Sequence, residues 1–227
     1  LKQRLAMPSD VIDLGGIAEL GGIAEEGGAV VVGGMTRHAT VAGSDLVKAK
    51  IPALAELAEM IGDPQVRNRG TIGGSIANND PASDYPGAVL GLGATVVTDR
   101  REIAADDFFT DMFETALAED ELVTAVRFPV PSKAKYMKFP NPASRYSMAG
   151  AMVAVTSGGV RVAVTGAAPC VFRWTEAEEA LAGNFDPAAL DALSVDADDL
   201  NSDIHGSAAY RANLVKVMAK RAVQALA

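Results

Sequence analysis

A glycine doublet set among polar residues is the feature that most restricts how this chain folds. It lies in the segment 67–78, which reads Arg-Asn-Arg-Gly-Thr-Ile-Gly-Gly-Ser-Ile-Ala-Asn. Glycine has no side chain to hold a ligand away from the main chain, and Thr71 and Ser75 place hydroxyl groups on either side of the doublet. Main-chain amides that converge in a turn form a concave site for anions. We therefore expect this segment to be a phosphate-binding loop.

An ordinary turn is the simplest alternative, because a Gly-Gly pair most often marks one. Ile72 and Ile76 argue against it, since a solvated linker needs no apolar anchors. The segment is not a Walker loop, because no Gly-Lys-Ser or Gly-Lys-Thr follows, and it lacks the Gly-x-Gly-x-x-Gly spacing of a Rossmann turn. A pre-formed small-molecule site is the interpretation we carry forward.

The segment resembles the second flavin-binding motif in the FAD subunits of the molybdenum hydroxylases, the carbon monoxide dehydrogenase and xanthine dehydrogenase group. The resemblance rests on Thr-Ile-Gly-Gly-Ser-Ile-Ala-Asn followed by Asp-Pro-Ala-Ser-Asp. Three further stretches are similar to the same family in the same order, and they are 33–38, 121–129 and 207–211. The resemblance covers essentially the whole chain.

The resemblance implies an FAD site. The amides around Gly73 and Gly74 would donate to the pyrophosphate, the Thr71 hydroxyl would orient it, and Asp84 would accept hydrogen bonds from the nucleotide. Family members often carry a basic residue where this chain has Pro140, and Lys138 is the candidate substitute. The full set of expected cofactor-binding residues is Thr71, Ile72, Gly73, Gly74, Ser75, Asn78, Asp84, Thr124 and Lys138.

The resemblance also implies partners. A large subunit would hold a molybdopterin cofactor and a small subunit the [2Fe-2S] clusters, in a heterotrimer or its dimer. FAD on this chain would relay electrons from the iron–sulfur partner to an external acceptor. Cys170 is the only cysteine, so four-cysteine cluster ligation is excluded here. No nucleophile with an adjacent base is found, so we nominate no catalytic residue.

The beginning of the chain leaves an alternative open. Leu1–Leu5 resembles the residues that directly follow the family's first glycine loop, so the resemblance implies that this loop is missing from the sequence. The alternative function is then a flavin-free scaffold that docks partner subunits without redox activity.

Composition argues against several classes of protein. A formal net charge of -9 gives no basic surface for nucleic acid. His38 and His205 are isolated from carboxylate clusters, so we expect structural or surface roles and no metal site. No apolar run is long enough to span a bilayer and no signal peptide opens the sequence, so a cytoplasmic protein is expected.

The predicted fold is α+β. Residues 1–130 are expected to form an FAD-binding domain of the two-loop type, with a mixed sheet and helices, and residues 131–227 a smaller α+β domain with an antiparallel sheet and helices. Pro129–Lys133 is the boundary because the composition shifts there. The main expected strands are 11–14, 29–32, 94–98, 121–128, 149–156 and 160–166, and Ser157–Gly159 is expected to be a hairpin turn between the last two. The main expected helices are 36–42, 44–61, 85–92, 176–182 and 210–227. Within 44–61, Ser44 is the expected N-cap and Pro52 starts a new helical segment after a kink, which Gly62 ends.

Two assignments stay undecided from the sequence. Arg67 and Arg69 flank the glycine segment, and they either steer a pyrophosphate or flavin or pair with acidic neighbours. Trp174 is the lone tryptophan and a candidate anchor for a partner subunit, because tryptophan is enriched at interfaces.

Overall fold

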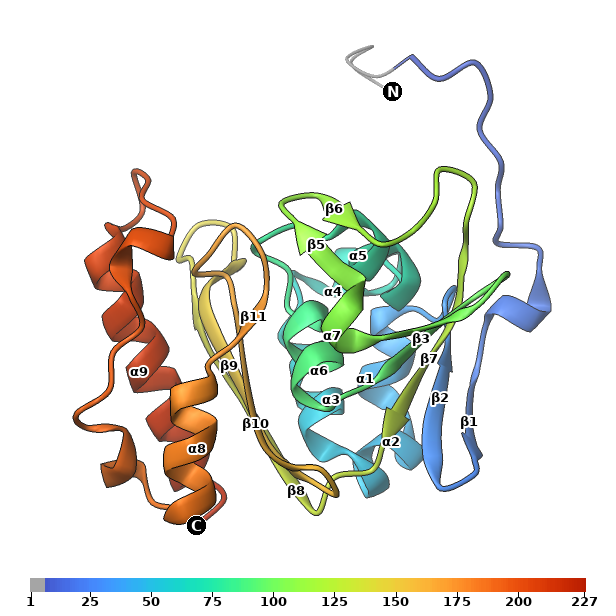
Figure 1. The fold of residues 1–227 in the computed structure, drawn as a ribbon. Coiled ribbons are helices and arrows are strands. Elements are labelled where there is room, and N and C mark those ends of the chain that lie inside the picture. Colours follow the sequence, from blue (N-terminus) through green and yellow to red (C-terminus); the bar gives the residue numbers. More distant parts are fainter. Residues whose placement is uncertain (1–6) are drawn as a thin grey trace.

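The computed structural model describes residues 7–227 and has a layered α+β architecture (Figure 1). One layer is a five-stranded sheet in which every strand pair is antiparallel. Its order is β1 (Ile23–Glu26), β2 (Ala29–Gly33), β7 (Val123–Pro129), β3 (Thr95–Thr98) and β4 (Glu102–Ala104). The α+β class is confirmed, and within the described residues the sheet expected to be mixed contains antiparallel pairs alone.

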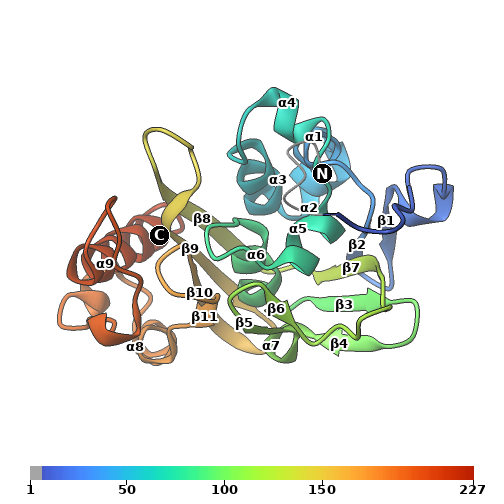
Figure 2. The ribbon, with the colours of Figure 1, turned by 90° about the horizontal axis from the view of Figure 1, so that it is seen from above.

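A second antiparallel sheet lies on the other side of the helices of the first domain (Figures 1 and 2). Its order is β11 (Phe172–Arg173), β10 (Gly159–Thr165), β9 (Ser147–Thr156) and β8 (Lys133–Pro140). Consecutive side chains of a strand point to opposite faces, and β9 is buried on both. Met152 and Ala154 pack into the core of the first domain, whereas Ala151 and Val153 pack toward the C-terminal helices.

Short helices fill the space between the two sheets (Figure 2). They are α1 (His38–Gly43), α2 (Asp45–Lys50), α3 (Pro52–Glu59), α4 (Pro64–Arg67), α5 (Ile72–Asn78) and α6 (Tyr85–Gly91). The small elements α7 (Ala105–Phe108), β5 (Phe109–Asp111) and β6 (Glu114–Thr115) follow β4. The outer face of the second sheet is covered by α8 (Thr175–Gly183) and α9 (Ala208–Gln224), which are joined through the 3₁₀ turns Pro187–Leu190 and Ala197–Asp199.

Local sequence signals set several of these boundaries as predicted. The Ser44 hydroxyl accepts a hydrogen bond from the amide of Val47 and so caps α2. Pro52 begins α3 at the position where its missing N–H costs nothing. Gly62 follows α3 with a φ of 49°, a conformation that favours glycine. The Ser157–Gly159 turn joins β9 to β10 as the expected hairpin.

Two predictions were wrong, and one undecided assignment is settled by burial. Residues 11–14 form no strand, and Val11 and Ile12 are 71% and 82% exposed. Most of the glycine segment is helical, because it contains the last residue of α4 and all of α5. Trp174 is 2% exposed and belongs to the core between the second sheet and α8, so it does not anchor a partner in this conformation.

The resemblance noted for Leu1–Leu5 falls outside the described residues. Within residues 7–227, no helix combines the length and the apolar character needed to cross a membrane.

Candidate functional site

The glycine doublet occupies the first turn of α5. Thr71 has extended backbone angles and is the N-cap residue, and its hydroxyl accepts a hydrogen bond from the amide of Gly74 at 3.2 Å. Ile72 and Ile76 are fully buried, as expected for anchors of this segment. The helix therefore forms despite two glycines, because a cap and a buried face offset their poor helix propensity.

The segment Gly33–His38 holds the glycine segment in place. The amide of Gly73 donates to the carbonyl oxygen of Gly34 at 2.8 Å, and the amide of Ile72 donates to that of Thr36 at 3.1 Å. A Cβ atom on Gly73 would lie 2.7 Å from the Gly34 oxygen, which is closer than real Cβ contacts. Gly73 is thus required by a close approach of two main chains, and its N–H is already bonded within the protein.

Gly34 also connects this segment to Thr124. The Gly34 amide donates to the Thr124 carbonyl oxygen at 2.7 Å, and the Thr124 hydroxyl donates to the carbonyl of Val97 on β3 at 3.1 Å. Two of the predicted site segments therefore meet at one glycine. The Gly33-Gly34 pair within 33–38 is the signal in the sequence that points to this junction.

A cavity of about 490 Å³ opens beside this junction. Its volume falls in the range typical of small-molecule sites. Thr71 lines it together with two arginines, one acid and apolar or glycine residues, and the full lining is Asp13, Gly15, Ile17, Ala18, Gly21, Met35, Arg37, Arg69 and Thr71. Gly74 is exposed, and a Cβ atom there would meet only the Thr71 hydroxyl, at 3.1 Å.

The other predicted residues of α5 lie along its length. Ser75 is half-buried, and Asn78 is exposed at the end of the helix. The next residue, Asn79, was missed by the sequence reasoning. It is buried with a φ of 43°, and its side-chain amide donates to the carbonyl oxygens of Asp111 and Glu114 at 2.7 and 2.8 Å. Asn79 thereby fixes the end of α5 against the β5–β6 hairpin.

Asp84 and Lys138 form a second cluster, away from Gly34. Lys138 Nζ lies 2.8 Å from Asp84 Oδ2, and the two side chains are 2% and 4% exposed. The Tyr136 hydroxyl donates to Asp84 Oδ1 at 2.6 Å, and Lys138 also donates to the carbonyl of Met60 at 3.1 Å. Burial raises the pKa of the Asp84 carboxyl, and the hydrogen bonds and charge of Lys138 and Tyr136 oppose that shift.

This pair links α6 to the second sheet. Asp84 immediately precedes α6, whereas Tyr136 and Lys138 belong to β8 of the second sheet. Lys138 also lines a cavity of about 500 Å³ together with Met60, Pro140 and Arg145. The predicted cofactor-binding residues thus fall into two groups. One group includes Thr71, which lines the cavity of about 490 Å³, and the other includes Lys138, which lines the cavity of about 500 Å³.

His38 and Tyr85 lie between the two groups. Their ring centroids are 5.2 Å apart, and a Cβ atom on Gly70 would lie 2.5 Å from His38 Nε2, so the histidine packs directly under the glycine segment. His38 is 5% exposed, and burial lowers its pKa from 6.5 to about 4. At neutral pH it is an uncharged core residue, which agrees with the structural role expected for it.

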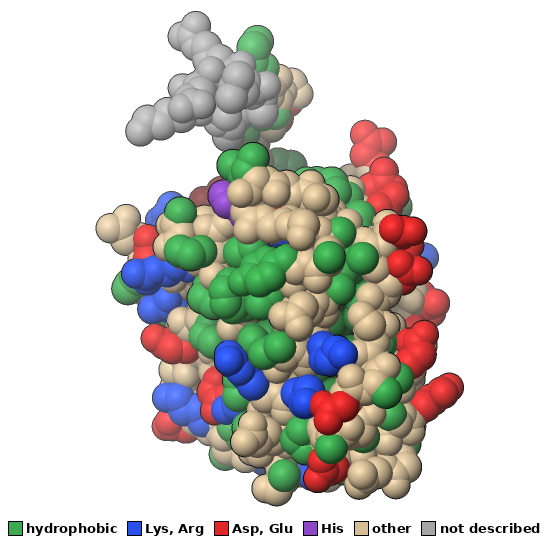
Figure 3. Space-filling view, turned by 90° about the vertical axis from the view of Figure 1, so that its left-hand side faces the viewer, with side chains coloured by type: hydrophobic (Ala, Val, Ile, Leu, Met, Phe, Trp, Pro, Cys, Tyr) green, Lys and Arg blue, Asp and Glu red, His purple; other side chains and the backbone are tan. Residues whose placement is uncertain are grey.

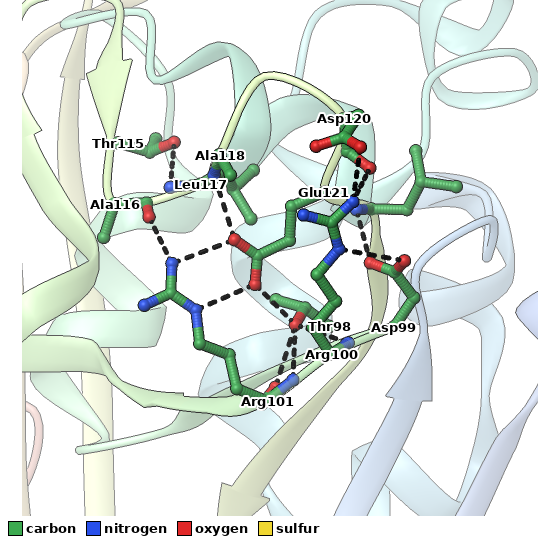
Figure 4. A network of polar contacts seen from close by, with 11 residues as sticks. Thr98, Asp99, Arg100, Arg101, Thr115, Ala116, Leu117, Ala118, Asp120 and Glu121 are labelled. Atoms are coloured by element: carbon green, nitrogen blue, oxygen red, sulfur yellow. Dashed lines mark hydrogen bonds and ion pairs between the residues drawn. The ribbon is translucent and has the colours of Figure 1, made fainter.

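A network of polar contacts stabilises the start of β7 close to Thr124 (Figure 4). Glu121 accepts hydrogen bonds from Arg101 Nε and Nη2, both at 2.9 Å, and from the Thr98 hydroxyl at 2.7 Å. The Ala118 amide donates to the same carboxylate at 2.9 Å. These contacts, the Arg101 hydrogen bonds first among them, lower the pKa of Glu121 from 4.5 to about 2. The carboxylate therefore ties β7 to the turn between β3 and β4.

Two family models match consecutive parts of the chain. The FAD binding domain in molybdopterin dehydrogenase matches residues 1–131, and the CO dehydrogenase flavoprotein C-terminal domain matches residues 134–226.

Proteins of known activity are similar over nearly the whole chain. The nicotine 6-hydroxylase medium subunit of Paenarthrobacter nicotinovorans is 38% identical over 98% of this chain and 84% of its own length. The carbon monoxide dehydrogenase medium chain of Afipia carboxidovorans is 38% identical over 99% of this chain and 83% of its own length.

Solved structures agree with the fold. Reconstituted CO dehydrogenase from Oligotropha carboxidovorans contains a chain with a TM-score of 0.90 and 37% identity, and the match covers 98% of this chain and 84% of that one. Carbon monoxide dehydrogenase from Hydrogenophaga pseudoflava, in a form that lacks the Mo-pyranopterin moiety, gives a TM-score of 0.88 and 38% identity, over 99% of this chain and 84% of that one.

Proposed function

We propose that this chain, which belongs to the family of FAD-binding medium subunits of the molybdenum hydroxylases, relays electrons from an iron–sulfur partner through FAD to an external acceptor. The chain is an oxidoreductase subunit and its cofactor is FAD. The observation that carries the proposal is the match of both family models, in order, along one chain.

The residues at the junction of the glycine segment fit a nucleotide. Thr71 lines the cavity of about 490 Å³, and Gly74 presents an exposed surface without a side chain beside it. We assign Thr71, Gly74 and Ser75 to the side of the site that faces the diphosphate, and Gly73, whose amide donates to Gly34, to hold them in place. Ile72 contributes by anchoring this turn to the core.

The remaining proposed contacts come from neighbouring elements. Thr124 is connected to the site by the hydrogen bond that its carbonyl oxygen accepts from the Gly34 amide, and Asn78 is exposed at the end of α5. Asp84 and Lys138 are bonded to each other, so we assign them to hold α6 and β8 in position at the edge of the site and to offer their remaining hydrogen-bonding capacity to the nucleotide.

FAD, when bound, supplies the electron-carrying chemistry, and the protein's task is to bind and orient it and to tune its environment. No side chain is proposed as a nucleophile or general base. We accordingly infer that the isolated chain does not turn over the substrate of the complex.

The proposed partners are a large subunit with a molybdopterin cofactor and a small [2Fe-2S] subunit. The comparison proteins are medium subunits or chains, which supports such an assembly. Figure 3 shows the face formed by the C-terminal domain, where hydrophobic side chains gather in the middle and acidic ones along one edge. Tyr210 in α9 is 42% exposed. Exposed apolar patches of this kind are typical of interaction sites.

The experiment distinguishes an electron-transfer subunit that carries FAD from a flavin-free subunit that only docks its partners. The chain is purified with excess FAD, freed of unbound flavin, and mixed with the two partner subunits. The relay predicts a yellow protein whose flavin absorption bleaches when the substrate of the complex is added. A colourless chain that still captures both partners would instead establish the flavin-free scaffold.

A further inference from the structure

We propose that the guanidinium groups of Arg37 and Arg69, on either side of Thr71, bind the diphosphate of the flavin nucleotide. This inference rests on the proposed function and names the side chains that supply the positive charge of the site. It also separates Arg69 from Arg67, which the sequence could not do.

The three main-chain amides that follow Thr71 already have partners. The amide of Ile72 donates to Thr36, that of Gly73 to Gly34, and that of Gly74 to the Thr71 hydroxyl. A diphosphate carries at least two negative charges, and its transfer from water requires compensating donors. With these three amides occupied, side chains that line the cavity can supply such donors.

Arg37 and Arg69 are placed to supply them. An antiparallel bridge pairs Arg37 with Thr71, and Arg69 lies two residues before Thr71, so both are held close to the threonine by the main chain. Both residues are exposed and both line the cavity of about 490 Å³. Among residues 7–227, neither guanidinium has an ion-pair or hydrogen-bond partner.

Arg67 shows the contrasting arrangement. Its side chain is 14% exposed, and it donates to the carbonyl oxygens of Ile61 and Gly62 at 3.0 and 3.3 Å. It also lies 3.4 Å from Glu59 and lines the other cavity, beside Lys138. Arg67 therefore closes the turn after α3, whereas Arg37 and Arg69 retain their full donor capacity toward the cavity.

The rest of the lining matches a nucleotide rather than a simple anion. Asp13 is the one acid among the lining residues, and its Oδ1 accepts a hydrogen bond from the Gly15 amide at 2.8 Å. An ionised carboxylate only accepts hydrogen bonds, so its free oxygen suits a ribose or ribityl hydroxyl. Two cations and one acid thus fit a ligand that combines a diphosphate with hydroxyl groups. A planar guanidinium group can donate two parallel hydrogen bonds to the oxygens of one phosphate, which favours arginine for this role.

The experiment compares flavin binding by the full chain and its variants. Dissociation constants for FAD and for riboflavin, which has no phosphate, are measured by flavin fluorescence for the wild type, Arg37→Gln, Arg69→Gln and the double variant. Arg221→Gln is the matched control, because Arg221 is exposed near the end of α9 and outside this cavity. Far-UV circular dichroism verifies folding of each protein.

We expect each single change to raise the dissociation constant for FAD about tenfold, which is the usual effect of losing one charge-assisted hydrogen bond. The double change should raise it further. Riboflavin binding stays within about twofold of the wild type, and ADP competes with FAD for the wild type far better than for the double variant. The FAD dissociation constant also rises less with salt in the double variant.

Two results would overturn the inference while leaving the proposed function intact. One is wild-type FAD affinity in the folded double variant, and the other is equal loss of FAD and riboflavin binding. Failure of the wild-type chain to bind either flavin would overturn the proposed function together with the inference. Preferential binding of NAD over FAD would show that the cavity accepts a different dinucleotide and would likewise reject the assignment.

Discussion

The amide of Gly73 donates a 2.8 Å hydrogen bond to the carbonyl oxygen of Gly34, and the two glycines pack main chain against main chain. A methyl group at residue 73 would lie 2.7 Å from that oxygen and 2.9 Å from the Gly34 Cα atom. Because both neighbours belong to the backbone, neither can rotate away. The contact therefore depends on glycine at position 73, whereas a Cβ atom on Gly34 would collide with the carbonyl oxygen of Val123.

Gly73→Ala is expected to lower the free energy of unfolding by about 1–3 kcal/mol, the usual effect of forcing an extra methyl group into a packed core. Gly183→Ala is the control, because nothing lies within 4 Å of a Cβ atom there. Urea denaturation of both variants measures the difference. Equal stability of the two would show that the segment 33–38 yields to accommodate a side chain.

Lys138→Met is expected to destabilise the protein by roughly 3–5 kcal/mol at neutral pH, because it leaves the buried Asp84 carboxyl without its cation. Lys135→Met is a matched control on the same strand. Lys135 pairs with Glu56 at 2.7 Å, but the side chains are 27% and 47% exposed, so its loss should cost about 0–1 kcal/mol. Recovery of stability in the double variant Asp84→Asn/Lys138→Met would support the pairing, and similar losses for Lys135 and Lys138 would contradict it.

Glu121 should stabilise the fold in a pH-dependent way. Its folded-state pKa is about 2, below the ordinary 4.5, so its contribution is complete above pH 4.5 and is lost as the pH falls toward 2. We expect the difference in Tm between wild type and Glu121→Gln to be constant near neutral pH and to shrink steadily below pH 4.5. Thermal unfolding across this range measures it, and a difference that stays constant down to pH 2 would refute the network's role.

His38 should make the protein sensitive to mild acid. Its folded-state pKa of about 4 lies below the ordinary 6.5, so stability is lost as the pH falls from 6.5 toward 4. The lowered pKa corresponds to a loss of roughly 3 kcal/mol in the free energy of unfolding once this buried ring is protonated. Denaturant unfolding of His38→Gln should show a shallower loss over that range, whereas His205→Gln, which changes an exposed residue, should keep the wild-type slope.

Local signals predicted much of the fold. Ser44, Pro52 and Gly62 act within one or two turns of the chain, so their effects can be read without knowledge of distant partners. The hairpin around Ser157–Gly159 is likewise specified by its own turn residues. Ile72 and Ile76 are buried as their spacing within a polar segment indicated.

The misses arise where distant contacts decide the outcome. Two glycines disfavour a helix, but α5 forms because bonds to Gly34 and Thr36 fix its first turn. The apolar run 11–14 looks like a buried strand, yet burial requires a neighbouring strand that composition does not specify.

The sequence likewise indicated some residues of the candidate site and not others. The family resemblance proposed both the glycine segment and Thr124, and in the structure the two meet at Gly34. The pairing of Asp84 with Lys138 joins residues that are far apart in the chain, and neither local sequence indicates it. Arg37 was not among the predicted residues, because its proposed role depends on a bridge to Thr71 that only the folded chain reveals.

The most direct test of the account is the FAD affinity of Gly74→Val compared with that of the wild type. Gly74 is exposed, and a Cβ atom there would lie 3.1 Å from the Thr71 hydroxyl, so the change should cost the fold about 1–2 kcal/mol, the usual effect of losing that helix cap. Isothermal titration is predicted to give one FAD per wild-type chain and no detectable binding by the folded variant, because valine projects into the space proposed for the diphosphate. Undiminished FAD binding by Gly74→Val would contradict the placement of the cofactor at this glycine segment.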